Sequence, residues 1–427
     1  MTLLIRNGRV IDPASGIDKI QDILVQEGKI AAVGERLAAN ANRELDAAGC
    51  FVMPGFIDLH VHLREPGYEY KETIETGSRA AAKGGFTTIL AMPNTKPVAD
   101  CPEIIRFVQD KAKKEALVHV LQVGAVTKGQ EGQELAQIDR MVDEGSPAIS
   151  EDGKSVMNSA LYREAMKIAA KRDIPVLAHC EDKNLVNGGV MNLDEKSKEL
   201  ALPGISNAVE DVIVARDILL AKETGVRLHL CHCSTKDSVR MVEQAKKQGV
   251  RVTAEVCPHH FTLATEEIKG DYGCYKMNPP LRSRQDVEAL KQGLKENIMD
   301  VIATDHAPHS NEEKAGGMQS SYFGIVGLET AVSLTITELL EPGFITPMQM
   351  AEKLSYNPAQ IIHSDRGTLG IGKPADIVII DPMKETIISS EEFVSKGKST
   401  PFQGKKVRGQ VKYTIVDGMI QYEEGVK

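Results

Sequence analysis

Two histidines alternate with apolar residues in the segment Asp58-Leu59-His60-Val61-His62-Leu63-Arg64. Alternate side chains of a β-strand point to the same face, so this spacing predicts that Asp58, His60 and His62 share one face. Two imidazoles on one strand face form half of a metal site, and zinc accepts imidazole readily. We expect His60 and His62 to bind metal and Asp58, which lies deeper, to support them. The alternative is a strand with two packed core histidines.

Further histidines and carboxylates stand at the ends of later apolar runs. Glu151 and Asp152 follow one such run, and His179, His232 and Asp305 each end another. The whole set holds more ligands than one tetrahedral zinc takes. It suits two metal ions about 3.5–4 Å apart that share a bridging carboxylate and a water-derived hydroxide.

The other histidines and cysteines are weaker candidates for metal binding. Strand alternation predicts that His229, Cys231 and Cys233 point to the opposite face, toward the helices. The pair His259-His260 follows an apolar run and is able to approach the site, but we expect a structural role for it. His309 lies four residues after Asp305, on the loop above the site, where it is either a functional residue or a bystander.

The middle of the chain alternates short apolar runs with helical stretches, about eight times. This pattern predicts parallel strands that close into a (β/α)₈ TIM-type barrel, with a doubly wound open sheet as the alternative. The active sites of such barrels lie at the carboxyl ends of the strands, where the candidate ligands stand. The predicted strands are Phe56–His62, Phe86–Met92, Val118–Val123, Pro147–Ser150, Ile174–His179, Arg227–His232, Val250–Val256 and Met299–Asp305.

The two ends of the chain resemble each other and differ from the middle. Turn pairs between β-rich runs predict hairpins at Asn7-Gly8, Glu27-Gly28 and Asp417-Gly418, and Ala375–Ile380 predicts a further strand. Isolated hairpins are marginally stable, so we expect both termini to join in one small β-sandwich domain. The predicted domains are residues 1–52 with 366–427, and the barrel over residues 53–365.

Composition limits the partners and the location of the protein. A net charge of −9 argues against general binding to nucleic acid or to an anionic membrane. Seven cysteines without framework spacing predict a reduced, cytoplasmic protein. The first residues lack the features of a signal peptide, and no apolar run is long enough to span a bilayer.

A two-metal site at this position predicts hydrolysis of a carbonyl compound through an activated hydroxide. Asp305 is our candidate for the group that takes the proton of the hydroxide and passes it to a leaving nitrogen. Arg64 is two residues past His62, and its guanidinium can bind a substrate carboxylate, although a salt bridge at the rim is the alternative. Asn94 can add a donor, and residues 310–321 suit either a lid or a disordered loop.

These motifs together carry a family resemblance. Pro54–His62 looks like the opening motif of the amidohydrolase superfamily. The runs Arg64–Gly67, Met92–Asn94, Ala303–His309 and Gly372–Asp376 resemble dihydroorotases of the longer bacterial type. The resemblance implies reversible hydrolysis of the cyclic amide of dihydroorotate to N-carbamoyl-L-aspartate, in the de novo biosynthesis of pyrimidines.

The resemblance also implies roles for single residues. His60, His62 and Asp305 would hold one Zn²⁺, and His179 and His232 the other. Asp152 would bridge the two ions; Lys154 is the alternative, because many superfamily members use a carbamylated lysine there. The positions that match substrate contacts are His62, Arg64, Asn94, Asn278, His309, Phe323 and Gly324.

Two other classes of function stay open at this point. One is a related cyclic amidase that acts on dihydropyrimidine, hydantoin or allantoin. An arginine that binds an acidic substrate would distinguish this chain from such an amidase. The other is a non-catalytic scaffold, which would be expected to lose ligands. The resemblance further implies a homodimer and a possible association with aspartate transcarbamoylase.

Overall fold

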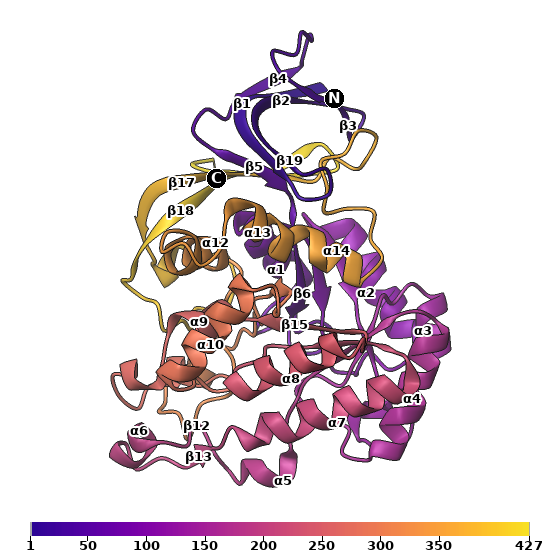
Figure 1. Ribbon diagram of the computed structural model, residues 1–427, viewed down its shortest axis with the longest axis vertical. Helices are drawn as coiled ribbons and strands as arrows, with labels where there is room; N and C mark the ends of the chain where they lie inside the picture. Colours follow the sequence, from indigo (N-terminus) through magenta and orange to yellow (C-terminus); the bar gives the residue numbers. More distant parts are fainter. Residues whose placement is uncertain (1, 427) are drawn as a thin grey trace.

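The computed structural model describes residues 2–426, and parallel strands arranged as a barrel form its centre (Figure 1). One parallel sheet has the order β6-β7-β8, and a second has the order β16-β15-β14-β11-β10-β9. The strands are β6 (Phe56–Val61), β7 (Phe86–Ala91), β8 (His119–Gln122), β9 (Gly124–Ala125), β10 (Ile149–Ser150), β11 (Pro175–Ala178), β14 (Arg227–Leu230), β15 (Val252–Val256) and β16 (Val301–Ile302).

Backbone hydrogen bonds join the two sheets at both seams. At one seam, β8 and β9 are two halves of one barrel strand, and the Val123 N–H between them donates to Ala91 O at 3.0 Å. At the other, the His62 N–H donates to His306 O at 2.8 Å, next to a parallel bridge between Val61 and His306. The barrel is therefore closed, as predicted, and the open-sheet alternative is wrong.

Helices cover the outside of the barrel, and several begin at a side-chain cap directly after a loop. Thr73, Asn158, Thr235 and Ser283 each accept a hydrogen bond from the first turn of a helix. The longer helices are α1 (Ile74–Lys83), α2 (Pro102–Glu115), α4 (Ser159–Lys171), α7 (Ala208–Thr224), α8 (Lys236–Lys247) and α10 (Arg284–Lys295). The shorter ones are α3 (Ile138–Asp143), α5 (Lys183–Val186), α6 (Glu195–Glu199), α9 (Pro258–Thr262), α11 (Asn311–Lys314), α12 (Ala331–Thr335), α13 (Pro347–Ala351) and α14 (Asn357–Ile361).

Two apolar clusters separate the inside of the barrel from its outside. Residues such as Phe86 and Leu230 pack between strands and helices, whereas Ile57, Leu59 and Leu177 belong to a separate cluster within the barrel. Both clusters are buried, and close packing of buried side chains makes the barrel a rigid support for the residues at the strand ends. Among residues 2–426, no helix is long and apolar enough to cross a membrane.

Strands from both termini form one eight-stranded sheet, and both chain ends lie in the upper part of the view in Figure 1. Its order is β19-β18-β17-β5-β1-β2-β3, and β4 pairs with β1. The strands are β1 (Thr2–Asp12), β2 (Ile17–Gln26), β3 (Lys29–Gly34), β4 (Arg43–Asp46), β5 (Phe51–Pro54), β17 (Ile377–Ile387), β18 (Lys406–Val416) and β19 (Met419–Glu423). The predicted domain boundary at residues 52/53 falls within β5; the domain boundaries stay predictions.

One predicted hairpin is wrong and two are correct. The chain turns at Glu27-Gly28 and Asp417-Gly418, where both residues of each pair have positive φ. At Asn7-Gly8 it continues, because Asn7 (φ 61°) forms a bulge within the single strand β1. The Asn7 N–H donates to Asp22 Oδ1 at 3.0 Å, which holds the bulge against β2.

Candidate metal and substrate site

The four predicted histidines surround the carboxylate of Asp152. Its Oδ1 lies 3.1 Å from His60 Nε2, 3.4 Å from His179 Nδ1 and 3.6 Å from His232 Nε2. Its Oδ2 lies 3.4 Å from His62 Nε2. Burial raises the pKa of Asp152, but the neighbouring rings of His60, His179 and His232 together lower it well below its usual range. Asp152 is therefore an anionic carboxylate within reach of all four imidazoles.

Asp305 completes the set just beyond β16. Its Oδ1 lies 3.3 Å from His62 Nε2 and 3.6 Å from His60 Nε2. Three residues of the site have left-handed backbone: Arg64 (φ 62°), His232 (φ 35°) and Asp305 (φ 47°). Non-glycine residues seldom adopt this conformation, and it is concentrated at functional sites. His232 and Asp305 thereby contact the shared centre, whereas Arg64 contacts Pro308 and His309.

The atoms that face one another in this centre lack the partners that buried polar atoms need. Within residues 2–426, His60 Nε2 and Asp152 Oδ1 are buried and have no hydrogen-bond partner. His179 Nδ1 and His232 Nε2 lie only 2.9 Å apart, although imidazole nitrogens are ordinarily metal ligands or hydrogen-bond partners of oxygen. Bound cations would satisfy all four atoms. The donor set, imidazole nitrogen with carboxylate oxygen, fits zinc.

Glu255 on β15 lies beneath this centre and was missed by the sequence reasoning. Its Oε1 accepts from His60 Nδ1 at 3.2 Å and from the His232 N–H at 3.1 Å, and its Oε2 accepts from His229 Nε2 at 2.9 Å. Because a carboxylate only accepts, His60 carries its proton on Nδ1 and directs the Nε2 lone pair toward Asp152. An acidic residue within the apolar run Val250–Val256 was the available signal.

The predicted orientation of His229 and Cys231 is wrong. Cys231 packs with the apolar residues inside the barrel, and His229 contacts Glu255 there, whereas Cys233 packs on the helix side as expected. The prediction extended strict alternation through His232. The positive φ of His232 reverses the face at that residue, so His229, Cys231 and His232 all turn inward.

The predicted substrate residues line one cavity of about 250 Å³ above the centre. Five of the six predicted metal ligands line it as well, and the sixth, His60, is fully buried. The lining consists of His62, Arg64, Asn94, Asp152, Gly153, His179, His232, Asn278, Asp305, Ala307, His309, Tyr322, Phe323 and Gly324.

Arg64 and His309 contact each other along one wall of the cavity. Arg64 Nε donates to Pro308 O at 3.1 Å, and the guanidinium lies 3.3 Å from His309. Burial, together with the positive charges of Arg64 and Lys71, lowers the pKa of His309 to about 3, so its imidazole is neutral. His309 Nε2 donates to Phe323 O at 2.9 Å, and the Tyr322 ring stacks on it. Arg64 is thus the fixed positive charge at this wall.

Two asparagines contact metal-ligand candidates and the cavity at once. Asn94 Oδ1 accepts from His62 Nδ1 at 2.9 Å, which leaves the Asn94 amide nitrogen for the cavity. Asn278 Nδ2 donates to Glu181 Oε2 at 2.8 Å. The same carboxylate oxygen accepts from His179 Nε2, also at 2.8 Å. Glu181 is a second carboxylate that the sequence reasoning missed; it stands two residues after His179 in the run His179-Cys180-Glu181.

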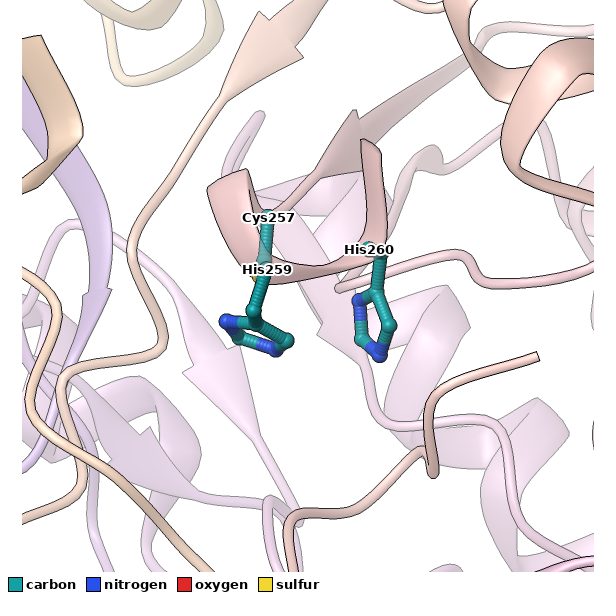
Figure 2. A group of neighbouring side chains, drawn as sticks. All are labelled: Cys257, His259 and His260. Atoms are coloured by element: carbon teal, nitrogen blue, oxygen red, sulfur yellow. The ribbon is translucent and has the colours of Figure 1, made fainter. Parts of the chain in front are cut away.

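Cys257, His259 and His260 form a separate buried group at the start of α9 (Figure 2). The two imidazoles lie side by side below the helix, and His260 Nε2 donates to Pro279 O at 2.9 Å. Burial lowers the pKa of His260 to about 4 and that of His259 well below its usual range, so both rings are neutral. The His260 contact holds the loop that carries Asn278, and the structural role expected for the pair stays a prediction.

A closed parallel barrel with histidines and carboxylates at its strand ends, joined to a sheet from both termini, defines an amidohydrolase-type metal-dependent hydrolase. Comparisons with known proteins specify the family. Residues 49–238 match the family described as "Dihydro-orotase-like". The chain is 49% identical to a dihydroorotase of Pelotomaculum thermopropionicum over 426 residues, covering 100% of both chains. It is 45% identical to one of Acetivibrio thermocellus, covering 99% of this chain and 100% of the relative.

Among solved structures, the L-hydantoinase (dihydropyrimidinase) of Arthrobacter aurescens is similar with a TM-score of 0.88 and 27% identity. The match covers 99% of this chain and 96% of that one. Given the full-length similarity to dihydroorotases, the chain belongs to the dihydroorotase family of cyclic amide hydrolases.

Proposed function

We propose that this protein binds two zinc ions and uses them to hydrolyse dihydroorotate reversibly to N-carbamoyl-L-aspartate. One observation carries the proposal: a single cavity is lined both by a buried set of histidines and carboxylates and by Arg64, Asn94 and His309. The first set fits metal-dependent hydrolysis, and the second fits an anionic substrate. Family membership at 49% identity supports the same activity.

His60, His62 and Asp305 would hold one zinc and His179 and His232 the other, with Asp152 shared between them. When bound, the ions lower the pKa of water from about 15.7 toward 7 and polarise the substrate carbonyl. Asp152 needs no modification to serve both sites, since its two oxygens face different histidines. Lys154, the alternative bridge, donates instead to Gln130 O at 3.1 Å.

Asp305 would move the proton that the reaction requires. Hydrolysis adds the water oxygen to the amide carbonyl carbon, breaks the C–N bond and leaves a proton on the departing nitrogen. Burial raises the pKa of Asp305, but the neighbouring His62 and His60 rings lower it below its usual range, so Asp305 is a carboxylate able to accept that proton. It lines the cavity, where it would return the proton to the nitrogen.

Arg64, with Asn94, would bind the substrate carboxylate, and His309 would line the same part of the cavity beside the guanidinium. A guanidinium matches a carboxylate through two parallel hydrogen bonds. The amide nitrogen of Asn94 would add a third donor. This carboxylate distinguishes dihydroorotate from dihydropyrimidines and hydantoins, the substrates of the alternative cyclic amidase, whose solved structures share the fold.

The homodimer and the association with aspartate transcarbamoylase stay predictions. So does the lid formed by residues 310–321, which include α11.

The proposed function is tested by comparing Arg64→Met with wild type on dihydroorotate and on dihydrouracil, which lacks the carboxylate. We expect wild type to prefer dihydroorotate and the variant to lose roughly 100-fold or more in kcat/KM for it, with little change for dihydrouracil. Arg79→Met is the matched control, because Arg79 is exposed on α1 and pairs with Glu75. Faster wild-type turnover of dihydrouracil or hydantoin would support the alternative amidase. A zinc-free protein that stays inactive after zinc is added would support the alternative that the protein is a non-catalytic scaffold.

A further inference from the structure

Glu181 connects a metal-ligand candidate with a substrate-binding candidate. Its Oε2 accepts from His179 Nε2 and from Asn278 Nδ2, each at 2.8 Å, although His179 follows β11 and Asn278 lies on a loop 97 residues after Glu181. Its side chain is 16% exposed, so both hydrogen bonds are largely shielded from water. The Glu181 N–H donates to Ser155 Oγ at 3.1 Å, and that hydroxyl donates to His179 O at 2.8 Å. Side chain and backbone are therefore both fixed.

The contact with His179 determines which imidazole nitrogen faces the metal centre. Because a carboxylate accepts and cannot donate, His179 carries its proton on Nε2. Its Nδ1 lone pair is then directed toward the centre, where it lies 3.4 Å from Asp152 Oδ1. A carboxylate in this position orients the ring and raises the basicity of the ligating nitrogen.

The contact with Asn278 determines which end of its amide faces the substrate. Since Nδ2 donates to Glu181, the oxygen Oδ1 is the atom left to the cavity that Asn278 lines. An amide oxygen only accepts hydrogen bonds, so it recognises an N–H group. A cyclic amide presents such a group on its ring.

We propose that Glu181 is a positioning residue that sets His179 for the metal and Asn278 Oδ1 for a ring N–H of the substrate through one carboxylate oxygen. The substrate half of this inference rests on the proposed function, whereas the metal half does not. Metal retention and recognition of the amide are thereby coupled: a change at Glu181 alters both, and a change at Asn278 alters only the second.

The test is a double-mutant cycle with Glu181→Gln and Asn278→Ala, read out by zinc affinity in a chelator competition and by KM at saturating zinc. We expect Glu181→Gln to weaken zinc binding by roughly 10- to 100-fold, and Asn278→Ala to leave it within about twofold of wild type. Each single variant should raise KM by roughly 10-fold or more, and the double variant should raise it no further than Asn278→Ala alone.

Asp182→Asn is the matched control. It removes one negative charge from the adjacent residue and retains an oxygen for the Asn184 N–H, which caps α5. We expect wild-type zinc affinity and KM. If Glu181→Gln fails to fold, Glu181→Asp replaces it, because the shorter carboxylate keeps the charge and withdraws from both partners.

Unchanged zinc affinity in the Glu181 variant, or KM effects that multiply in the double variant, would overturn the inference. Failure of the proposed function looks different: zinc-loaded wild type would not turn over dihydroorotate at all. The zinc measurements would still decide the role of Glu181 toward His179 in that case.

Discussion

Neutralising Glu255 should weaken zinc binding without removing any proposed ligand. Glu255 is fully buried and accepts three hydrogen bonds, from His60, His229 and the backbone of His232. Glu255→Gln keeps the shape. Its amide oxygen can still accept from His60 and the His232 N–H, while its amide nitrogen donates to His229 Nε2. His229 accommodates this by moving its proton to Nδ1, which then donates to Thr253 Oγ1, 2.8 Å away.

What the substitution removes is therefore the charge. A hydrogen bond to a charged group contributes about 1.5–3 kcal/mol, against about 1 kcal/mol for a neutral one, so the bond to His60 weakens by about 0.5–2 kcal/mol. Outer partners of metal-binding histidines affect affinity by roughly 10- to 100-fold, which corresponds to about 1.4–2.7 kcal/mol. The two ranges overlap, and we expect a loss of roughly 10-fold or more in zinc affinity.

The assay is a competition titration of zinc against a chelator, together with thermal unfolding. Asp217→Asn is the control for neutralising a buried carboxylate elsewhere: Asp217 lies on α7 and pairs with Arg216 at 2.7 Å. We expect the control to lose stability and keep zinc affinity. A Glu255→Gln protein that melts early but binds zinc like wild type would refute the reasoning, since Glu255 would then support only the barrel.

Three further predictions concern the metal bridge, a buried amine and the terminal sheet. Asp152→Ala should lower the zinc content by at least one ion per chain, whereas Lys154→Ala should not; the reverse result in elemental analysis would move the bridge to Lys154. Burial lowers the pKa of Lys353 to about 8, so between pH 8 and 10.5 the unfolded chain holds a proton that the folded chain lacks, and stability rises with pH by up to about 3 kcal/mol. Lys353→Met should flatten this rise in pH-dependent denaturant melts, and an identical slope would contradict it. A Cβ on Gly8 would lie 2.3 Å from Val52 Cγ2, so Gly8→Ala should cost about 1–3 kcal/mol, while Gly34→Ala, with a contact of 3.4 Å, should cost less in the same melts.

The barrel and the ligand set were predictable because they depend on repeated local patterns. Apolar runs, helical stretches and polar residues at strand ends indicate a closed parallel barrel with one active rim, and His179, His232 and Asp305 lie at that rim. Two of the three predicted hairpins were correct for the same reason, since their turn residues favour positive φ.

The parts that were not predictable depend on single backbone angles and on contacts distant in sequence. The left-handed conformation of His232 reverses the face of its strand, and no residue type at that position signals it. The bulge at Asn7 uses residues that equally favour a hairpin. Glu255 and Glu181 acquire their roles only when the fold brings His60 and Asn278 to them, across 195 and 97 residues.

The terminal sheet has a consequence for how the chain assembles at the ribosome. β5 pairs with β17, and Val52 lies opposite Ile379, so a strand made early is joined by one made more than 300 residues later. Until then the apolar face formed by Leu3, Val10 and Val52 lacks Ile377, Ile379 and Ile415, with which it packs. The nascent amino-terminal strands therefore keep an unpaired edge while the entire barrel is synthesised. Chaperones bind exposed surfaces of this kind.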